Sequence, residues 1–520
     1  MHVFRRLRHI ITACLALLLI LNLTGGTYVN TLQLHVYLDD AQDPTQALAD
    51  AAKQAQQEGK ELFLYGKTAN IVDSLTINVP VTFEGSLCLK VAEGCTLTFA
   101  ETVTASPKQI FSGEGSVRFT REDQEGYPQW FGAKGVGRDD TEAFQKAVDA
   151  LPVLLVPNAT YVLSDIVISR PLILRGVGAA KVSVNAAKET NRLFTLQSSH
   201  ITVENLNISM KSAPEGSVCF YFDTAKTPLE DFVLRNLWVS YARVGLCDAK
   251  SGVNHINGLL MDAVDFRSAN GVQLDMYDFD SNLSLIEVTV TRREDALLGI
   301  RVNMPAAIFR NINQMLVEHF DVNGDAHVSS ITNRYNFDPK WVSQNLDGHG
   351  AVFENCRNVR MIRSLAEYVS GAGFIIKNCS GFDFENVQPY TYHTYGIYAE
   401  NLTDSRFEIL KATGNGDITL SYENLFFKNC SNLEFTGVLS CESRGDALRL
   451  EGCKNITFQS YMATSGAMAA FADGGGNENV VFRSFISSYT KEVAKLTGSG
   501  VTIQNTIVEN KAVYPVYDGQ

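Results

Sequence analysis

The sequence predicts an all-β fold: a right-handed parallel β-helix, which is a solenoid of short strands, with short capping helices. Three observations predict it. A unit of about 23 residues repeats between Ala351 and Phe458, an asparagine occupies one fixed position of that unit, and a glycine-rich segment with a short helical stretch precedes the repeats. A unit this short cannot bury its apolar face alone, so copies of it must stack on one another.

Five anchor residues define the repeat. They are spaced 23, 23, 28 and 23 residues apart and are Cys356, Cys379, Leu402, Cys430 and Cys453. The positions three and five residues before each anchor are apolar and the position two before is charged, which is the alternation of a strand with one buried face. We expect the stacked strands to lie about 4.8 Å apart. A helical or leucine-rich repeat is rejected because no 3.6-residue period survives in these units.

A row of asparagines is predicted at one turn of the solenoid. The residue before each anchor is Asn355, Asn378, Asn401, Asn429 or Gly452. Asparagine tolerates left-handed backbone geometry, and its amide can hydrogen-bond the same amide one coil away. Cysteine at the anchor position predicts buried, stacked thiols. Outside the repeat, Cys88 and Cys95 are candidates for a disulfide.

The N-terminus predicts an export signal. Arg5, Arg6 and Arg8 precede a predominantly apolar run of 14 residues, Ile10 to Leu23. This run is shorter than the roughly 20 residues of a membrane span. We therefore expect residues 1–26 to be a signal peptide and the protein to be secreted or at the cell surface. An uncleaved anchor is the alternative, and it is the one route to a membrane.

The charge balance argues against a nucleic-acid partner. The formal net charge is −13 at pH 7, whereas binding to phosphates needs clustered Lys and Arg. The composition, 45% hydrophobic and 19% charged, is that of a chain that can bury a core along its length.

The segment that precedes the repeats runs from Trp130 to Phe144 and has the sequence WFGAKGVGRDDTEAF. Asp139 with Glu142 resembles a capping box, and an apolar stripe follows, so we expect a short helix over residues 140–150. Such a helix would cover the exposed edge of a first coil.

This segment resembles a motif of the pectate-lyase-like superfamily, W-F-G-A-K-G-x-G-x-D-D-T-x-A, with Val136 where the pattern usually has Asp. That superfamily includes pectate lyases, polygalacturonase relatives, glucanases, alginate epimerases and phage tailspikes. The resemblance implies a right-handed parallel β-helix over residues 127–510, followed by a tail at 511–520, and it implies a polysaccharide partner. The motif specifies the architecture more strongly than the reaction.

The chain is also predicted to start its β-helix twice. Glu61–Gly85 aligns without a gap on Pro152–Gly176, and a helix-like stretch precedes each copy. We therefore predict a short head module at residues 32–126 before the main β-helix. Accidental similarity between two strand pairs is the alternative.

Equivalent positions on neighbouring coils become neighbours in space, so a functional wall is predicted nine and seven residues before the anchors. Its candidate acids, bases and charge-neutralising residues are Asp347, His349, His393, Glu423, Arg444 and Asp446. Aromatic residues expected to stack on sugar rings are Tyr368, Tyr390, Tyr392, Tyr395 and Trp341. The alternative is a solvated polar turn, which any solenoid must have.

A long insertion, Asn303 to Asn345, interrupts the repeat. It carries Asp321, Asn323 and Asp325, whose D-x-N-x-D spacing is that of a calcium loop, although Thr332 stands where the bidentate Glu is expected. We therefore treat Ca²⁺ as a candidate cofactor, with an ordinary turn as the alternative. Together these features predict an exported protein that cleaves or modifies a polysaccharide, as a glycoside hydrolase, lyase or epimerase. A non-catalytic glycan-binding or surface structural β-helix is the alternative.

Overall fold

A computed structural model describes most of the chain between residues 32 and 509. The described ranges are 32–178, 182–251, 253–269, 271–277, 279–292, 304–324, 346–414, 422–443, 445–464 and 467–509. The predicted signal segment, the C-terminal tail, Asp325, Trp341 and Arg444 lie outside the described residues.

The chain divides into two compact units. The first comprises the residues up to Lys134 together with Glu142–Pro157, and the second comprises Gly135–Thr141 and the chain from Asn158 onward. The first unit contains three small parallel sheets, ordered β1-β2-β5-β8, β10-β7-β4 and β3-β6-β9. Its strands are β1 (Gln33–Tyr37), β2 (Glu61–Tyr65), β3 (Thr68–Ile71), β4 (Leu75–Ile77), β5 (Val81–Phe83), β6 (Cys88–Val91), β7 (Thr96–Phe99), β8 (Val103–Thr104), β9 (Phe111–Ser112), β10 (Ser116–Phe119), β11 (Glu125–Gly126) and β13 (Val153–Pro157).

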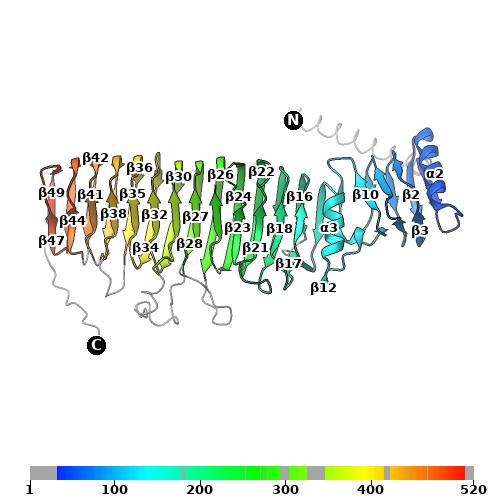
Figure 1. The fold of residues 1–520 in the computed structure, drawn as a ribbon, viewed down its shortest axis with the longest axis horizontal. Helices are drawn as coiled ribbons and strands as arrows, with labels where there is room; N and C mark the ends of the chain where they lie inside the picture. The colour runs from blue at the N-terminus through cyan, green and yellow to red at the C-terminus, as the bar shows by residue number, and fades with distance from the viewer. Residues whose placement is uncertain are drawn as a thin grey trace, which may run out of the picture. The chain divides into compact units, whose positions relative to one another are not determined.

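Helix α2 (Pro44–Glu58) packs on the strands of the first unit (Figure 1). The Asp43 side chain accepts a hydrogen bond from the Gln46 amide at 3.0 Å, which caps the N-terminus of the helix. Gly59 ends the helix in the left-handed conformation, with φ of 63°. The buried stripe of the helix includes Leu48 and Ala55, both fully inaccessible.

The glycine-rich segment predicted to precede the coils contains a 3₁₀ helix, η2 (Pro128–Phe131), and strand β12 (Val136–Asp139), and it leads into helix α3 (Thr141–Ala150). The predicted helix at residues 140–150 is thus confirmed. Asp139 accepts from the Thr141 amide at 2.9 Å, and buried Asp140 accepts from the Gly135 amide at 3.0 Å. Gly135 has φ of 64°, a conformation that costs any residue with a Cβ atom. The paired aspartates therefore fix the turn that begins the main coil.

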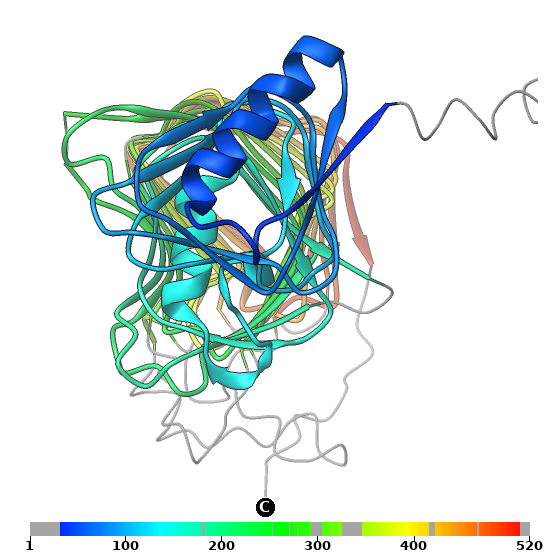
Figure 2. The ribbon, with the colours of Figure 1, turned by 90° about the vertical axis from the view of Figure 1, so that its right-hand side faces the viewer.

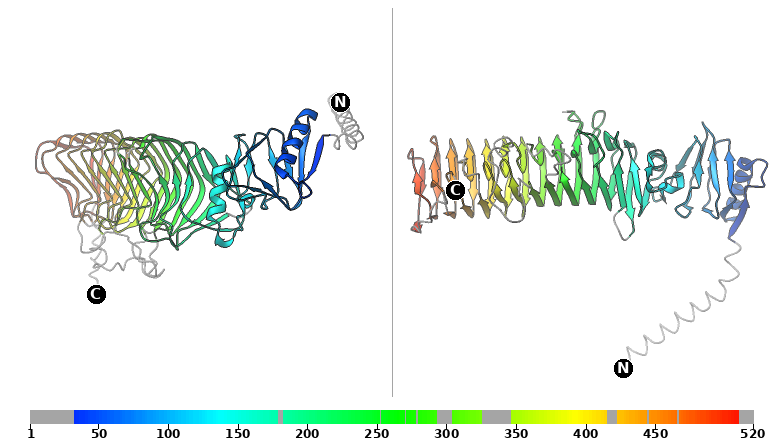
Figure 3. Two further views of the ribbon diagram at one scale, coloured as in Figure 1. Left: turned by 45° about the vertical axis from the view of Figure 1, so that its right-hand side comes forward. Right: turned by 90° about the horizontal axis from the view of Figure 1, so that it is seen from below.

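The second unit is a right-handed parallel β-helix, which confirms the predicted fold class. Each coil runs through three strand positions, here called sheets 1, 2a and 2b, and then rises to the next coil (Figures 1 and 3). Sheet 1 is a parallel sheet of 13 strands. They are β15 (Ile166–Ile168), β18 (Arg192–Leu196), β21 (Val218–Phe222), β23 (Val244–Asp248), β25 (Leu274–Tyr277), β27 (Ala307–Arg310), β29 (Ala351–Glu354), β32 (Phe374–Lys377), β35 (Ile397–Glu400), β38 (Leu425–Lys428), β41 (Leu448–Glu451), β44 (Ala469–Asp473) and β47 (Glu492–Lys495).

Sheets 2a and 2b share one continuous parallel sheet that bends within each coil. In sheet 2a lie β16 (Leu172–Val177), β19 (Ile201–Glu204), β30 (Arg357–Ile362), β33 (Asp383–Glu385), β36 (Thr403–Glu408), β39 (Ser431–Phe435), β42 (Lys454–Phe458), β45 (Glu478–Phe482) and β48 (Val501–Ile503). In sheet 2b lie β14 (Thr160–Leu163), β17 (Val182–Ala186), β20 (Leu206–Ser209), β31 (Leu365–Val369), β34 (Gln388–Tyr392), β37 (Leu410–Thr413), β40 (Val438–Cys441), β43 (Tyr461–Thr464), β46 (Phe485–Ser488) and β49 (Thr506–Glu509). Four long strands cross both positions: β22 (Leu229–Ser240), β24 (Ile256–Ala269), β26 (Phe279–Arg292) and β28 (Asn313–Asn323).

Residues that share a phase of the 23-residue unit lie over one another, as predicted (Figure 2). The column five residues after the anchor is buried, and from Phe407 onward its rings stack face to face. Centroids of Phe407 and Phe435 are 4.7 Å apart, and those of Phe435 and Phe458 are 4.4 Å apart. The same column continues to Phe482. Aromatic stacking along the axis therefore fills the core of the coil.

The predicted asparagine row is present. Asn355, Asn378, Asn401 and Asn429 all have φ between 51° and 56°. The Asn401 side-chain amide donates to the Asn378 side-chain oxygen at 2.8 Å, and Asn355 donates to Asn311 at 3.2 Å. A second row, not predicted, lies within sheet 2a, where the amide-to-oxygen distances between Asn432, Asn455 and Asn479 are about 3 Å.

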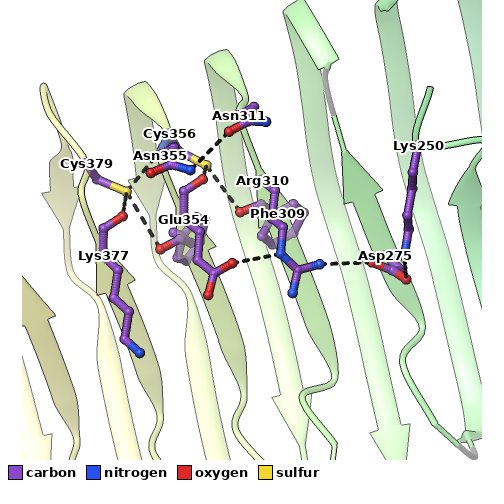
Figure 4. A network of polar contacts seen from close by, with 11 residues as sticks. Lys250, Asp275, Phe309, Arg310, Asn311, Glu354, Asn355, Cys356, Lys377 and Cys379 are labelled. Atoms are coloured by element: carbon purple, nitrogen blue, oxygen red, sulfur yellow. Dashed lines mark hydrogen bonds and ion pairs between the residues drawn. The ribbon is translucent and has the colours of Figure 1, made fainter. Parts of the chain in front are cut away.

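The anchor cysteines are buried free thiols, as the repeat predicted. Cys356 and Cys379 stack on adjacent coils, and the Cys379 sulfur accepts from the Cys356 amide at 3.3 Å (Figure 4). Cys88 and Cys95 are also free: one thiol donates to Ser112 and the other to the Val72 carbonyl. The candidate disulfide between them is therefore not formed.

A charged row runs along the outward face of sheet 1. The Arg310 side chain contacts Glu354 at 2.7 Å and Asp275 at 3.5 Å, and Asp275 also contacts Lys250 (Figure 4). Further along the stack Lys377, Glu400, Lys428 and Glu451 continue the same column with alternating sign. Alternation places unlike charges on neighbouring coils, which stabilises the row where like charges would repel.

The two aligned segments predicted to be duplicate starts of the β-helix have the same order of elements. One has α2 followed by β2 to β5, and the other has α3 followed by β13 to β16.

Among the helices of the described residues, none has the length and apolar character needed to cross a bilayer.

Candidate functional site

The predicted wall splits into inward and outward residues. Asp347 is exposed, whereas His393 is 1% exposed and its Nδ1 atom lies 3.0 Å from the Val369 carbonyl oxygen. The position nine residues before the anchor therefore turns inward at His393. The prediction that His393 faces a substrate is wrong, because the turn that enters sheet 1 folds this ring into the coil.

Tyr392 is also an interior residue. It is 1% exposed and packs against two glycines, Gly396 and Gly414, where any Cβ atom would overlap its ring. Burial raises the pKa of its phenol well above the usual value. The prediction that Tyr392 stacks on a sugar is therefore wrong: Thr391, with φ of 51°, breaks the alternation of β34, so Tyr390 is exposed while Tyr392 turns inward.

His349 has a structural partner. Its Nδ1 atom accepts a hydrogen bond from the Ala372 amide at 2.9 Å, one coil away. A ring nitrogen that accepts a backbone N–H is not free to act as a base. We therefore assign His349 to the turn rather than to catalysis.

The structure brings Tyr395, Glu423 and Asp446 together on three consecutive coils. Backbone bonds from Gly373 to the Tyr395 carbonyl and from Asn424 to the Asp446 carbonyl fix this register. Both carboxylates are already neutralised: Glu423 lies 3.7 Å from Arg449, and Asp446 lies 2.8 Å from Lys495. Burial raises the pKa of Glu423, and the charge of Asp446 adds to this while Arg449 opposes it.

The candidate calcium residues do not form a calcium loop. Asp321 and Asn323 lie in strand β28, in register with Leu365 and Glu367 of β31. The Asn323 amide donates to a Glu367 carboxylate oxygen at 3.0 Å. An extended strand separates alternate side chains along one face and cannot wrap a cation as a loop does. The calcium prediction is wrong for Asp321 and Asn323, and the described residues contain no group of three potential ligands.

Asp321 and Glu367 instead form a carboxylate pair. Asp321 lies under Leu365, so Glu367 is one coil up and two residues along. With strand spacings of about 4.8 Å across and 3.3 Å along, their Cβ positions are roughly 8 Å apart. Neither carboxylate is in an ion pair with a Lys or Arg of the described residues. This pair is the candidate functional site.

Both acids of the pair have raised pKa values. Burial is the largest cause of the raised pKa of Asp321, partly offset by His319. Burial is also the largest cause for Glu367, and the negative charge of Asp321 raises the Glu367 pKa further. The Asn323 hydrogen bond opposes this by favouring the ionised form. Two acids on one face with raised pKa values are typical of sites of acid–base chemistry.

Aromatic side chains lie on the same outward face of sheet 2b. Tyr390 pairs with Glu367 on the next coil and is 36% exposed, and its ring contacts that of Tyr368 edge-on at 6.2 Å. In the other direction the column of Asp321 continues through Thr289 and Asp265 to Trp238. Trp238 is 39% exposed.

Arg267 completes this face. Its guanidinium lies 4.4 Å from the centre of the Trp238 ring and is ion-paired with Asp265. The cation–π contact thus holds the Trp238 ring beside Arg267 on this face. From Trp238 to Tyr390 the face spans five coil steps, about 24 Å at the usual strand spacing.

Sequence reasoning missed Glu367, Trp238, Asp265 and Arg267. Glu367 lies 11 residues after the anchor Cys356, and Tyr390 lies 11 after Cys379. The repeat therefore places both residues in one outward column. The sequence prediction considered positions up to five residues after each anchor, and this column lies beyond them. Trp238 and Asp265 precede the regular repeats, where long strands replace the 23-residue unit.

No protein-family model matches the sequence, and no curated protein matches it. The solved structures with a similar chain fold include the A-module of mannuronan C-5 epimerase AlgE4 from Azotobacter vinelandii, with a TM-score of 0.47, 10% identity, and coverage of 73% of this chain and 99% of that one. Tailspike protein 3 of bacteriophage CBA120 has a TM-score of 0.40 and 11% identity, over 75% of this chain and 64% of that one. The Streptococcus pneumoniae surface protein and adhesin PfbA has a TM-score of 0.34 and 11% identity, over 74% and 98%. At these identities and TM-scores, similarity does not assign an activity.

Proposed function

We propose that this chain is an exported carbohydrate-active enzyme that cleaves a polysaccharide lying along the outward face of sheet 2b. The observation that carries the proposal is the Asp321–Glu367 pair, two half-buried carboxylates on adjacent coils whose pKa values are both raised. Glycoside hydrolysis requires two carboxyl groups flanking one bond, one protonated and one ionised.

The two acids take different roles. The charge of Asp321 raises the pKa of Glu367, and this favours Glu367 as the proton donor of the pair. Glu367 would donate that proton to the leaving glycosidic oxygen, while ionised Asp321 would accept a proton from the water that attacks the anomeric carbon. The spacing of roughly 8 Å between Cβ positions, set by strand geometry, suits an inverting enzyme, whose carboxyl groups lie about 6.5–9.5 Å apart.

Aromatic rings at each end of the face would hold the chain of sugars. Trp238 and Tyr390 are the exposed rings, and hydroxyl, amide and carboxylate groups lie between them. Stacked rings bind the apolar faces of sugars, and the polar groups bind hydroxyls. Export, predicted from the N-terminal segment, would bring the protein to an extracellular polymer.

The test is a screen of the purified mature protein against a panel of polysaccharides, measuring both reducing ends and the absorbance of unsaturated products. We expect new reducing ends without that absorbance, and a loss of about 10²–10⁴-fold in kcat for Glu367→Gln. The matched control is Glu423→Gln, which removes a carboxylate of the ion-paired cluster and should leave the rate within a few-fold. Unsaturated products would show that the chain cleaves by elimination and not by hydrolysis. An equal loss of kcat in the Glu367→Gln protein and in the control would reject Glu367 as the catalytic acid.

A non-catalytic glycan-binding protein is the second candidate. It is favoured by the cluster at Glu423 and Asp446, where each carboxylate already has a cation partner and no acid is left for chemistry. Retention of a polysaccharide without any product, repeated with calcium present, would support this candidate over the enzyme.

A further inference from the structure

A patch of four aromatic side chains lies on the outward side of sheet 1, away from the carboxylate pair on sheet 2b. Tyr398 and Phe426 occupy the same outward position of β35 and β38, and Tyr395 and Tyr422 lie just before these strands. Ring centroids are 5.3 Å apart between Tyr395 and Tyr398, 5.1 Å between Tyr395 and Tyr422, and 5.4 Å between Tyr398 and Phe426. All four side chains are half-buried.

The patch has a firm base. Tyr395 and Tyr398 pack against Val352, Ala372 and Ile375, which form an apolar cluster on this part of the solenoid and are at most 7% exposed. Rings that are seated on such a base lose little freedom when a ligand covers them. Four aromatic residues on two consecutive coils also exceed what the outer face of a solenoid needs for stability, since polar residues serve there equally well.

The rim of the patch is polar and electrically balanced. Arg449 follows Phe426 in the outward column, and its guanidinium lies 5.4 Å from the centre of that ring. It contacts Glu423 at 3.7 Å and Glu451 at 3.4 Å. Lys495 contacts Asp446 at 2.8 Å. These cations are committed to carboxylates of the protein, so the rim offers hydrogen bonds without a strong net field.

We infer that this aromatic patch is a second glycan-binding site and that it takes an uncharged polysaccharide. A sugar ring has one apolar face and a rim of hydroxyls, and the patch has a matching arrangement of ring faces with donors and acceptors around them. An anionic glycan would face Glu423 and Asp446 without a free cation among the described rim residues. The phenol of Tyr398, which donates to Glu400 at 3.2 Å, leaves its ring face unaffected.

The inference does not depend on catalysis at Asp321 and Glu367, and its test is built to be independent of it. Binding is measured by affinity electrophoresis in gels that contain mixed-linkage β-glucan, xylan or galactomannan, with polygalacturonate as the anionic probe. The Glu367→Gln protein is used throughout, so that turnover does not remove the ligand. A result for the patch then neither supports nor rejects the proposed reaction.

We expect Tyr398→Ala and Phe426→Ala each to weaken retention by at least one neutral polysaccharide about tenfold, which is the loss of one stacked ring. Tyr398→Phe should retain binding, because it keeps the ring and removes only the hydroxyl. Tyr489→Ala, an exposed tyrosine elsewhere on the solenoid at 44% exposure, is the matched control and should bind as the parent does. Thermal denaturation of each variant separates loss of binding from loss of fold.

Three outcomes would overturn the inference. The first is unchanged retention in Tyr398→Ala and Phe426→Ala proteins that are folded. The second is retention by polygalacturonate alone. The third is self-association in light scattering that disappears in the same two variants, which would identify the patch as a contact between copies of the chain.

Discussion

Asp321 lies one coil below Leu365, which places its carboxylate diagonally beside that of Glu367 on the same outward face. The relation differs from that of Glu423 and Asp446, which share a column but are each held by a cation. Burial raises the pKa of Glu423 as well, but Arg449 opposes that effect, whereas no Lys or Arg is among the causes of the raised pKa values of Asp321 and Glu367. The two carboxylate pairs of the solenoid are therefore suited to different tasks.

Replacing the exposed tyrosine of the candidate site should weaken substrate binding more than the chemical step. Tyr390→Ala removes a ring that pairs with Glu367 and leaves both carboxylates of the site in place. We expect KM to rise about tenfold, equivalent to about 1.4 kcal/mol, with kcat changed less. Steady-state kinetics on the polysaccharide found by the screen measures both. Tyr390→Phe is the control, and a fall in kcat with KM constant would contradict a role in stacking.

Asp248 should make the stability of the solenoid depend on pH. It occupies an inward position of sheet 1 between Phe222 and Met276 and is 6% exposed, and burial raises its pKa to about 7. A raised pKa contributes stability that is present below the ordinary value near 4 and is lost as pH rises through 7. The advantage of wild type over Asp248→Asn should therefore shrink between pH 4 and 8, by up to a few kcal/mol. Denaturation midpoints at pH 4.5, 6 and 8 measure this.

Asp473 is the matched control for Asp248 because it lies in the same inward column near the other end of the stack. It accepts hydrogen bonds from Gly475, Asn477 and Thr497, and its pKa is lowered despite burial. Its contribution should be present at neutral pH and lost in acid, the opposite sign to Asp248. Parallel pH profiles for the Asp248→Asn and Asp473→Asn proteins would contradict the account.

The asparagine row should contribute through its backbone geometry and through its amides. Asn401 has φ of 56° and donates to Asn378 at 2.8 Å. Asn401→Gly keeps the conformation and loses about 1 kcal/mol of hydrogen bonding, whereas Asn401→Ala also adds left-handed strain of about 1–2 kcal/mol. We expect the alanine variant to be less stable than the glycine variant in chemical denaturation. Equal stability of the two variants would show that the ladder bond, and not the turn, governs this position.

Thiol chemistry should follow burial. The described cysteines are all free, and Cys356, Cys379, Cys430 and Cys453 are buried. Without reductant, we expect maleimide to label the native protein at Cys88 and Cys95 first and to reach the four anchors only after denaturation. Peptide mapping identifies the modified residues. A disulfide-linked peptide containing Cys88 and Cys95 would contradict the free thiols of the structure.

The fold was predictable because the repeat states one physical fact many times. Each coil carries an apolar pair, a charge, an asparagine and an anchor at fixed spacing. The position of Phe374 and Ile397 within the unit could therefore be assigned to the matching residue of all the remaining coils. Outward positions carry no such constraint. Tyr390 and Tyr392 are identical in type, and only the side of β34 on which each lies separates their roles. The sequence alone does not show on which side each one lies.

The candidate site was only partly predictable for a related reason. Asp321 and Asn323 were recognised as a pair with metal-ligand spacing, but that spacing is also the period of a strand face. Distinguishing the two required the partner strand, β31, which brings Glu367 beside them from 44 residues away in the sequence. The insertion between them hides this proximity. The column at Tyr395, Glu423 and Asp446, where one unit is lengthened only from 23 to 28 residues, was assembled from spacing alone.

The most direct test of the central claim is chemical rescue with an activated substrate. An aryl glycoside of the sugar identified by the screen has a leaving group that departs without a proton, so it bypasses a missing general acid. The account predicts that Glu367→Gln recovers at least tenfold on the aryl glycoside relative to the natural linkage, while Asp321→Asn does not recover. Equal recovery in both variants, or full activity of Glu367→Gln on the polysaccharide, would contradict it.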